Sequence, residues 1–286
     1  MDQQNNATAS PVTAAPTKTP RLIAVANQKG GVGKTTTAIN LATALAACQR
    51  RTLIIDFDPQ GNASTGLGFD RNRRHAVAGT YEVLCGSASI AQATHATAIP
   101  GLDIICATED LAGAELELAD MPRRERRLRD ALIGLDSYDY VLIDCPPALG
   151  LLTLNAMVAA QSVLIPLQCE FFALEGLSQL LRTIDRVRRN LNPTLELQGV
   201  VLTMFDMRNN LSGQVASDVR AHLGEKVYNT IVPRNVRISE APSHGKPALI
   251  YDYRCPGSQA YIKLASEILR RELLPPAPPA NAPIAA

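Results

Sequence analysis

The sequence has no tryptophan, and aromatic residues make up only 4% of it. Its six cysteines lie far apart in the chain and form no Cys-x-x-Cys pair. This spacing argues against a disulfide scaffold or a paired-thiol metal site, and the cysteines are expected to be reduced packing residues. Neither sign of charge dominates, since 28 Lys and Arg oppose 27 Asp and Glu. Any surface for a charged macromolecule must therefore be a local patch.

Long uninterrupted apolar runs are also missing. The longest apolar stretch, residues 141–160, contains Asp144, Pro146 and Pro147, so it is too irregular to cross a membrane. The first 20 residues are polar and rich in Pro, Ala and Thr, unlike a secretory signal. We therefore expect a cytoplasmic protein that does not bind membranes.

Both ends of the chain are poor in large apolar residues. Residues 1–20 and 275–286 are expected to be disordered tails, because such segments bury too little apolar surface to offset the entropy of ordering. The remaining residues, 21–274, have the length of one large α/β domain. Hydrophobic residues make up 46% of the chain, which is enough for a full core.

Within that domain, short β-rich apolar runs alternate with helix-like segments. The predicted strands are 22–27, 52–58, 102–107, 140–147, 162–168, 197–205 and 227–233. The predicted helices are 35–48, about 149–160, 174–190, 211–223 and 257–273. Nearly continuous apolar strands are typical of sheets covered on both faces. The alternation predicts an α/β fold with a doubly wound, mostly parallel sheet and helices on both faces.

The first predicted strand runs directly into a glycine-rich segment, NQKGGVGKTT, followed by a helix. Glycines let the backbone wrap closely around a phosphate, and the start of the helix adds partial positive charge. Lys34 can reach the β- and γ-phosphates of a nucleotide, and the Thr35 hydroxyl can ligate Mg²⁺. The predicted phosphate-binding residues are Lys29, Gly30, Gly31, Val32, Gly33, Lys34, Thr35 and Thr36.

Acidic residues follow two other strands. Asp56 and Asp58 end the second strand and are spaced to point to the same side, near the expected phosphate position. Asp144 ends the apolar run YVLID, as in a Walker B strand. We expect Asp144 to hold Mg²⁺ through water. ATP and Mg²⁺ are therefore the predicted cofactors.

The glycine-rich loop departs from the general P-loop pattern. Gln28 stands where the pattern has its first glycine, and an additional lysine, Lys29, follows it. This K-G-G-x-G-K-T sequence resembles the deviant Walker A motif of the ParA, MinD and nitrogenase iron protein group. The resemblance implies that Lys29 reaches across a dimer interface to the phosphates of ATP bound by the other subunit. A cation supplied in this way stabilises charge on phosphoryl oxygens, as an arginine finger does.

Across residues 21–273 the chain is similar to the ParA/Soj family of DNA-partitioning ATPases. The segment DFDPQGN resembles that family's switch region, which implies that Asp58 positions the attacking water. The segment 230–247 resembles the family's adenine-side loop, which places Pro233 and Asn235 at the nucleotide. With Lys29 and Lys34, Asp58 completes the expected catalytic set.

The same resemblance implies DNA binding. Arg208 and Arg237 match positions at which ParA/Soj proteins bind DNA without sequence preference. The expected assembly is an ATP-bound homodimer that binds non-specific double-stranded DNA and associates with the nucleoid. Release follows slow ATP hydrolysis, stimulated by a ParB-type centromere-binding protein. The 20-residue N-terminal tail is too short to fold as an additional DNA-reading domain.

Other function classes are less consistent with the residues. A MinD-like membrane or cargo-positioning ATPase is the main alternative, but the C-terminal sequence has five prolines and no Phe or Trp. An iron–sulfur reductase would need cysteines in glycine-rich loops, a setting that Cys106 and Cys145 lack. A dinucleotide enzyme is disfavoured because Thr36 replaces the third glycine of its fingerprint. The sequence leaves open whether the cargo is a chromosome, a plasmid or something else.

Overall fold

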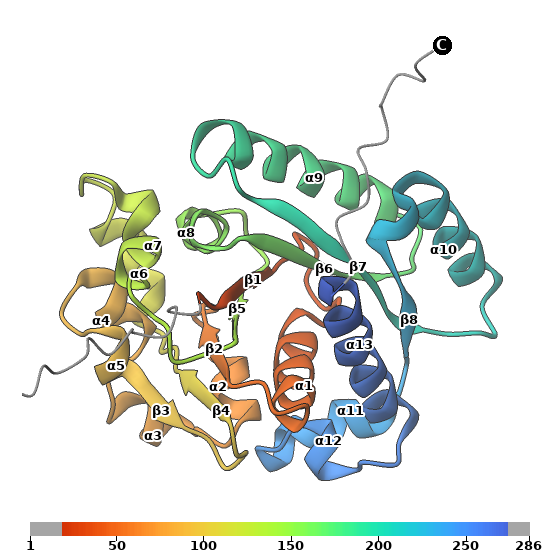
Figure 1. The fold of residues 1–286 in the computed structure, drawn as a ribbon, viewed down its shortest axis with the longest axis horizontal. Helices are drawn as coiled ribbons and strands as arrows, with labels where there is room; N and C mark the ends of the chain where they lie inside the picture. Colours follow the sequence, from red (N-terminus) through yellow and green to blue (C-terminus); the bar gives the residue numbers. More distant parts are fainter. Residues whose placement is uncertain (1–18, 274–286) are drawn as a thin grey trace, which may run out of the picture.

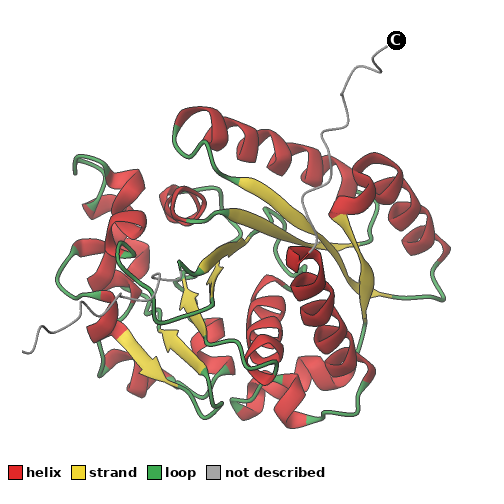
Figure 2. Cartoon of the chain, in the orientation of Figure 1, coloured by secondary structure: helices red, strands yellow, loops and turns green. Residues whose placement is uncertain are grey.

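The structure is a computed structural model that describes residues 19–273. Eight strands within this range form a single sheet in the order β3-β4-β2-β5-β1-β6-β7-β8 (Figures 1 and 2). The strands are β1 (Arg21–Val25), β2 (Thr52–Asp56), β3 (Thr94–Ala96), β4 (Leu102–Ile105), β5 (Tyr140–Asp144), β6 (Ser162–Gln168), β7 (Glu196–Phe205) and β8 (Val227–Pro233). Every neighbouring pair is parallel except β3 and β4. The two expected tails lie outside the described residues.

Helices connect the strands and cover both faces of the sheet. The α-helices are α1 (Lys34–Ala47), α2 (Asn62–Gly66), α3 (Arg71–His75), α4 (Thr80–Cys85), α5 (Ile90–Ala93), α6 (Leu111–Glu117), α7 (Arg127–Ala131), α8 (Leu151–Ala159), α9 (Ala173–Asn190), α10 (Asn210–Leu223), α11 (Val236–Glu240), α12 (Ala248–Tyr251) and α13 (Pro256–Leu273). Three 3-10 turns are η1 (Arg124–Arg126), η2 (Gly224–Lys226) and η3 (Ala241–His244). The doubly wound α/β fold predicted from the sequence is confirmed.

Two hydrophobic cores lie on opposite faces of the sheet. Along β1, Leu22 and Ala24 pack into one core, while Ile23 and Val25 pack into the other. This alternation follows from the two-residue period of a strand. Helices α8, α9 and α10 cover the first face, and α1 and α13 cover the second (Figure 1).

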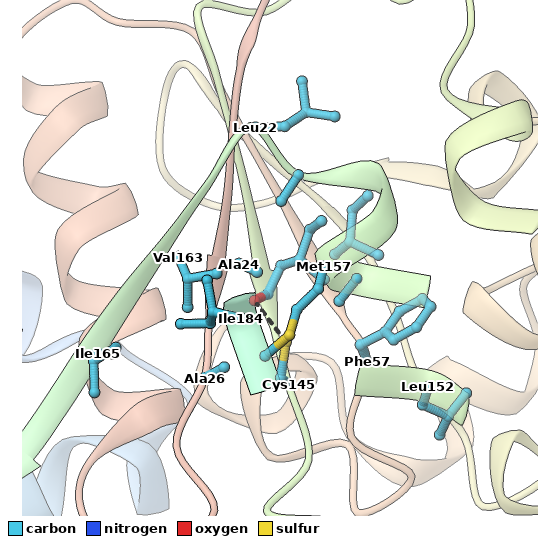
Figure 3. Close-up of a cluster of buried hydrophobic side chains, with 14 of the residues drawn as sticks. Leu22, Ala24, Ala26, Phe57, Cys145, Leu152, Met157, Val163, Ile165 and Ile184 are labelled. Atoms are coloured by element: carbon cyan, nitrogen blue, oxygen red, sulfur yellow. Dashed lines mark hydrogen bonds between the residues drawn. The ribbon is translucent and has the colours of Figure 1, made fainter. Parts of the chain in front are cut away.

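Figure 3 shows how buried hydrophobic side chains pack together in the first core. Met157 of α8 and Ile184 of α9 lie near Ala24 of β1, and all three side chains are buried. The Cys145 thiol donates a weak hydrogen bond to the Ile143 carbonyl at 3.6 Å, so this cysteine packs within the core. Close packing beneath the strand ends gives the residues at that edge a rigid support.

Candidate nucleotide site

The loop between β1 and α1 leaves the helix start open. Gly31 and Gly33 adopt φ values of 75° and 86°, in the left-handed region that side chains other than glycine rarely enter. Gly33 precedes α1, and no side chain caps the helix there. The first N–H groups of a helix have no partner within the helix, so they are available to an anionic ligand.

Residues from distant strands hold this loop in place. The Asn27 amide donates to the Pro166 carbonyl at 2.7 Å, and the Asn27 side-chain oxygen accepts from the Lys29 N–H at 3.0 Å. The Thr203 hydroxyl on β7 donates to the Val32 carbonyl at 2.8 Å. Sequence analysis missed Asn27 and Thr203 as supports, and for Thr203 the sequence offers no local signal because 171 positions separate the partners.

Lys34 is largely buried, with 7% of its surface exposed. Its Nζ donates to the Lys29 carbonyl at 3.1 Å, so the side chain curls back over the loop. Burial lowers the pKa of Lys34, while the neighbouring charges of Asp144, Cys145 and Asp58 act in the opposite direction. The ammonium group therefore lies among acidic groups at the point where the loop would hold phosphates.

Asp144 is fully buried, and within the described residues neither of its carboxylate oxygens has a hydrogen-bond partner. Strand register places it beside Val25 of β1 and Asp56 of β2, at the shared carboxyl edge of the three strands. Burial raises the pKa of Asp144 well above its usual range, and the charge of Asp56 adds to this; the Thr35 side chain and Lys34 oppose it. An unpaired buried carboxylate is costly unless a cation satisfies it. Together with the Thr35 hydroxyl, it fits a Mg²⁺ site.

The two carboxylates after β2 differ in their surroundings. Asp56 is fully buried and accepts from the Ser64 N–H at 2.8 Å and the Ser64 hydroxyl at 2.6 Å. Burial raises its pKa to about 6 despite these hydrogen bonds. Asp58 keeps 8% of its surface exposed and accepts from the Gln60 N–H at 3.0 Å. Asp56 is thus bound into the fold, while Asp58 is the carboxylate nearer to solvent.

Lys29 points away from its own loop. Its Nζ forms an ion pair with Glu170, which follows β6, and both side chains are more than two-fifths exposed. The described structure therefore does not bring the Lys29 ammonium together with Lys34. An exposed lysine on this edge is available to a second molecule, which is the role that the sequence predicts for it.

Pro233 and Asn235 lie farther along the sheet. Pro233 ends β8 and pairs with Phe205 of β7, and β6 and β7 separate β8 from β1. Asn235 caps α11, where its side-chain oxygen accepts from the Arg237 N–H at 3.0 Å. Within residues 19–273, no hydrogen bond or ion pair links either residue to the glycine-rich loop, so their place at an adenine ring stays a prediction.

Arg208 and Arg237 follow the neighbouring strands β7 and β8, and each is paired with a carboxylate. Arg208 is bound to both carboxylate oxygens of Asp206, at 3.0 and 2.9 Å, and its side chain is 88% exposed. Arg237 binds Glu240 at 3.0 Å and lies 3.6 Å from Asp252. The Arg234 N–H donates to the Phe205 carbonyl at 3.1 Å, which joins the ends of β7 and β8, where the two arginine-bearing segments begin. Sequence reasoning missed these acidic partners.

A glycine-rich loop between β1 and α1, with acidic residues ending two neighbouring parallel strands, defines a P-loop nucleotide-binding protein. The family model described as "AAA domain" matches residues 20–197. "Chromosome partitioning protein ParA" of Caulobacter vibrioides is 64% identical over 255 residues, which cover 88% of this chain and 95% of that protein. "Sporulation initiation inhibitor protein Soj" of Bacillus subtilis is 51% identical over 87% of this chain and 98% of that protein.

The chain belongs to the ParA/Soj family of partitioning ATPases. A solved structure carries the same fold with ligands. It is described as cobyrinic acid a,c-diamide synthase from Mycobacterium smegmatis with bound ADP and magnesium. It is 39% identical, superposes with a TM-score of 0.77, and covers 89% of this chain and 96% of its own. The family resemblance predicted from the sequence is confirmed.

Proposed function

We propose that the protein is a partitioning ATPase that binds ATP and Mg²⁺ at the carboxyl edge of β1, β2 and β5. The observation that carries this proposal is the unpaired, buried Asp144 carboxylate beside the open start of α1. The 64% identity to a chromosome partitioning protein and the ADP and magnesium bound by the M. smegmatis protein support it. Thr35 and Asp144 would hold Mg²⁺, which would neutralise charge on the phosphates.

Lys34 and Lys29 would bind the phosphates of two different ATP molecules. Lys34, buried among acidic groups, would contact the β- and γ-phosphates of ATP in its own subunit. Lys29, exposed and paired with Glu170, would leave that partner and contact the nucleotide of a second subunit. The interface would then contain the nucleotide, so that ATP binding favours a homodimer.

Asp58 is the residue proposed to orient the attacking water. It is the carboxylate after β2 that retains exposure, while both oxygens of Asp56 are hydrogen bonded within the chain. Orienting water beside the γ-phosphate is the usual role of a polar residue in phosphoryl transfer to water. Hydrolysis would be slow until a ParB-type partner orders the site.

DNA binding is the proposed output of the dimer. Arg208 and Arg237 would contact phosphates without reading bases, and dimerisation would double the number of contacts. Their pairing with Asp206 and Glu240 means that DNA must compete with protein carboxylates. We therefore expect weak binding by a monomer and nucleoid association only in the ATP state.

A MinD-like membrane or cargo-positioning ATPase is the alternative function, and its membrane-binding segment would be the C-terminal sequence, which lies outside the described residues. No helix within residues 19–273 is both long enough and apolar enough to span a bilayer. Co-sedimentation with vesicles in the presence of ATP distinguishes the two functions. Binding to vesicles, together with failure to bind DNA, would replace the partitioning proposal with the membrane one.

The proposal is tested by measuring molecular mass and DNA binding in parallel. With ATP and Mg²⁺ the protein should sediment as a dimer and shift two unrelated DNA duplexes equally. With ADP it should remain a monomer and shift neither duplex. DNA binding that is the same in ATP and ADP would contradict the proposed switch.

A further inference from the structure

Arg74 is an arginine that the nucleotide site does not account for. It lies on α3 and is only 6% exposed, and within the described residues its Nε has no hydrogen-bond partner. Burying a guanidinium group is costly unless nearby groups accept its hydrogen bonds or balance its charge. Its contacts lie at the carboxyl edge of the sheet rather than at the outer surface.

The Arg74 guanidinium joins two loops that follow neighbouring strands. Its Nη1 donates to the Gln60 carbonyl at 3.4 Å and to the Ala107 carbonyl at 3.2 Å. Gln60 belongs to the loop after β2, and Ala107 belongs to the loop after β4. The guanidinium also occupies the space over Gly61, where an added Cβ would lie 1.4 Å from Nη1. Gly61, with a φ of 62°, therefore leaves room for this bridge.

Gln60 connects Arg74 directly to the proposed catalytic carboxylate. The Gln60 carbonyl accepts from Arg74, and the N–H of the same residue donates to Asp58 at 3.0 Å. Because Arg74 holds the carbonyl of Gln60, it also helps to hold the Gln60 N–H that donates to Asp58. Within residues 19–273, Asp58 and Arg74 are the two residues whose side chains form hydrogen bonds with the backbone of Gln60.

The connection closes into a ring of hydrogen bonds. From Ala107, the N–H donates to the Ser64 hydroxyl at 3.1 Å, and that hydroxyl donates to Asp56 at 2.6 Å. The ring returns to Asp58 because the Asp58 N–H donates to Asp56 at 3.3 Å. Both acidic residues after β2 thus share one network, and Arg74 is its cationic member.

We propose that Arg74 is a positioning residue that holds the segment 58–61 so that Asp58 can orient water for ATP hydrolysis. This inference rests on the proposed role of Asp58. Misplacing a catalytic group by about 1 Å can reduce a rate about 100-fold. Loss of Arg74 should therefore slow hydrolysis and prolong the ATP-bound dimer, while leaving the contacts of Lys34 and Asp144 with nucleotide and metal in place.

The test compares Arg74→Met, Arg74→Lys and a control, Arg73→Ala. Arg73 lies on the same short helix, is exposed, and stacks on Phe69 at 3.8 Å, outside the ring. Hydrolysis should fall by about tenfold or more in Arg74→Met, less in Arg74→Lys, and not in Arg73→Ala. ATP affinity, measured by titration of a fluorescent analogue, should stay within about twofold in all three. Equal losses of affinity and rate in both Arg74 variants would show a merely structural role and overturn the inference.

A double variant decides whether Arg74 acts through Asp58. Adding Arg74→Lys to Asp58→Ala should leave the lifetime of the ATP-bound dimer unchanged, because residues that act as one unit are not additive. A further increase in lifetime, or normal hydrolysis by Arg74→Lys and Arg74→Met alone, would overturn the inference. Normal hydrolysis by Asp58→Ala alone would instead overturn the proposed function of Asp58.

Discussion

Charged side chains have opposite surroundings at the nucleotide edge and in the arginine-bearing segments that follow β7 and β8. At the nucleotide edge, Asp144 is buried with no hydrogen-bond partner among residues 19–273, and Lys34 is buried near it. After β7 and β8, Arg208 in a loop and Arg237 on α11 are exposed, and each has a carboxylate partner. At the nucleotide edge, a bound cation would satisfy the buried Asp144 carboxylate. At the second site, a ligand must displace Asp206 and Glu240 before it can bind Arg208 and Arg237.

This difference has energetic consequences. Electrostatic interactions of buried groups are strong because water does not screen them, whereas exposed ion pairs contribute about 0–1 kcal/mol. Substitutions at the nucleotide edge should therefore have large effects that depend little on salt. Substitutions in the arginine-bearing segments should have small, salt-dependent effects. The predictions below test this ordering.

The largest expected effect is that of Lys34→Ala on ATP binding. Removing the buried cation should weaken ATP affinity by about 100-fold or more, because a charge-assisted contact with phosphate is lost. Titration calorimetry measures it, with Arg186→Ala on the exposed face of α9 as the control. Unchanged affinity in Lys34→Ala would show that ATP binds elsewhere.

Asp58→Ala should affect hydrolysis rather than binding. We expect turnover to fall by about 100-fold while ATP affinity changes by less than about threefold, because the carboxylate acts on water and not on the nucleotide. Phosphate release under saturating ATP measures the rate. Asp56→Asn is a matched comparison, and we expect it to lower stability because Asp56 binds Ser64 within the fold. Normal turnover in Asp58→Ala would exclude the proposed role.

In the arginine-bearing segments, Arg208→Ala and Arg237→Ala should each weaken DNA binding, and each variant should lose the same affinity on unrelated duplexes. The slope of log affinity against log salt should fall by about 0.9 for each phosphate contact removed. Asp206→Asn should do the reverse and strengthen binding, because it frees Arg208. Gel shifts across a salt series measure both effects. A Asp206→Asn variant that binds DNA like the wild type would show that the pair does not compete with DNA.

The pH dependence of this pair follows from Asp206. Hydrogen bonds from Arg208 lower the pKa of Asp206 to about 2. A carboxyl group with a lowered pKa is charged above its unfolded value of about 3.9 and loses its contribution only as the pH falls toward 2. The pair should therefore be intact from about pH 6 to about pH 8, and DNA affinity should not change in this range because of it. A filter-binding series over that range checks this.

The smallest expected effect is that of Glu170→Gln. Releasing Lys29 from its exposed ion pair should lower the ATP concentration needed for half-maximal dimerisation by up to about fivefold, because such pairs contribute about 1 kcal/mol or less. Light scattering against ATP concentration measures it. A higher threshold in Glu170→Gln would mean that Glu170 supports the dimer instead of competing with it.

The long, strongly patterned elements could be predicted from the sequence. The apolar runs at β1, β2, β5 and β6 are buried strands, and the glycine-rich motif lies at the start of α1. The region between β2 and β5 was less predictable. Apart from β4, it contains the three-residue strand β3 and helices of four to seven residues, which are too short to show a clear period.

Within the site, local motifs predicted roles for Lys34 and Asp144, and the family resemblance predicted the role of Asp58, because each residue lies at or beside a strand end or helix start that the sequence marks clearly. The supports could not be predicted in the same way. Thr203 and Arg74 act on residues 171 and 14 positions away, and only the folded topology brings them together. Likewise, sequence gave no reason to pair Lys29 with Glu170, which is 141 positions distant.

We propose that ATP, held at the edge of β1, β2 and β5, joins two subunits through Lys29. Light scattering of the wild type, Lys29→Ala and Asp58→Ala with ATP and with ADP tests it most directly. We expect dimers with ATP for the wild type, long-lived dimers for Asp58→Ala, and monomers for Lys29→Ala even when ATP is bound. All three proteins should be monomers with ADP. A Lys29→Ala variant that dimerises normally with ATP would show that Lys29 does not join the two subunits.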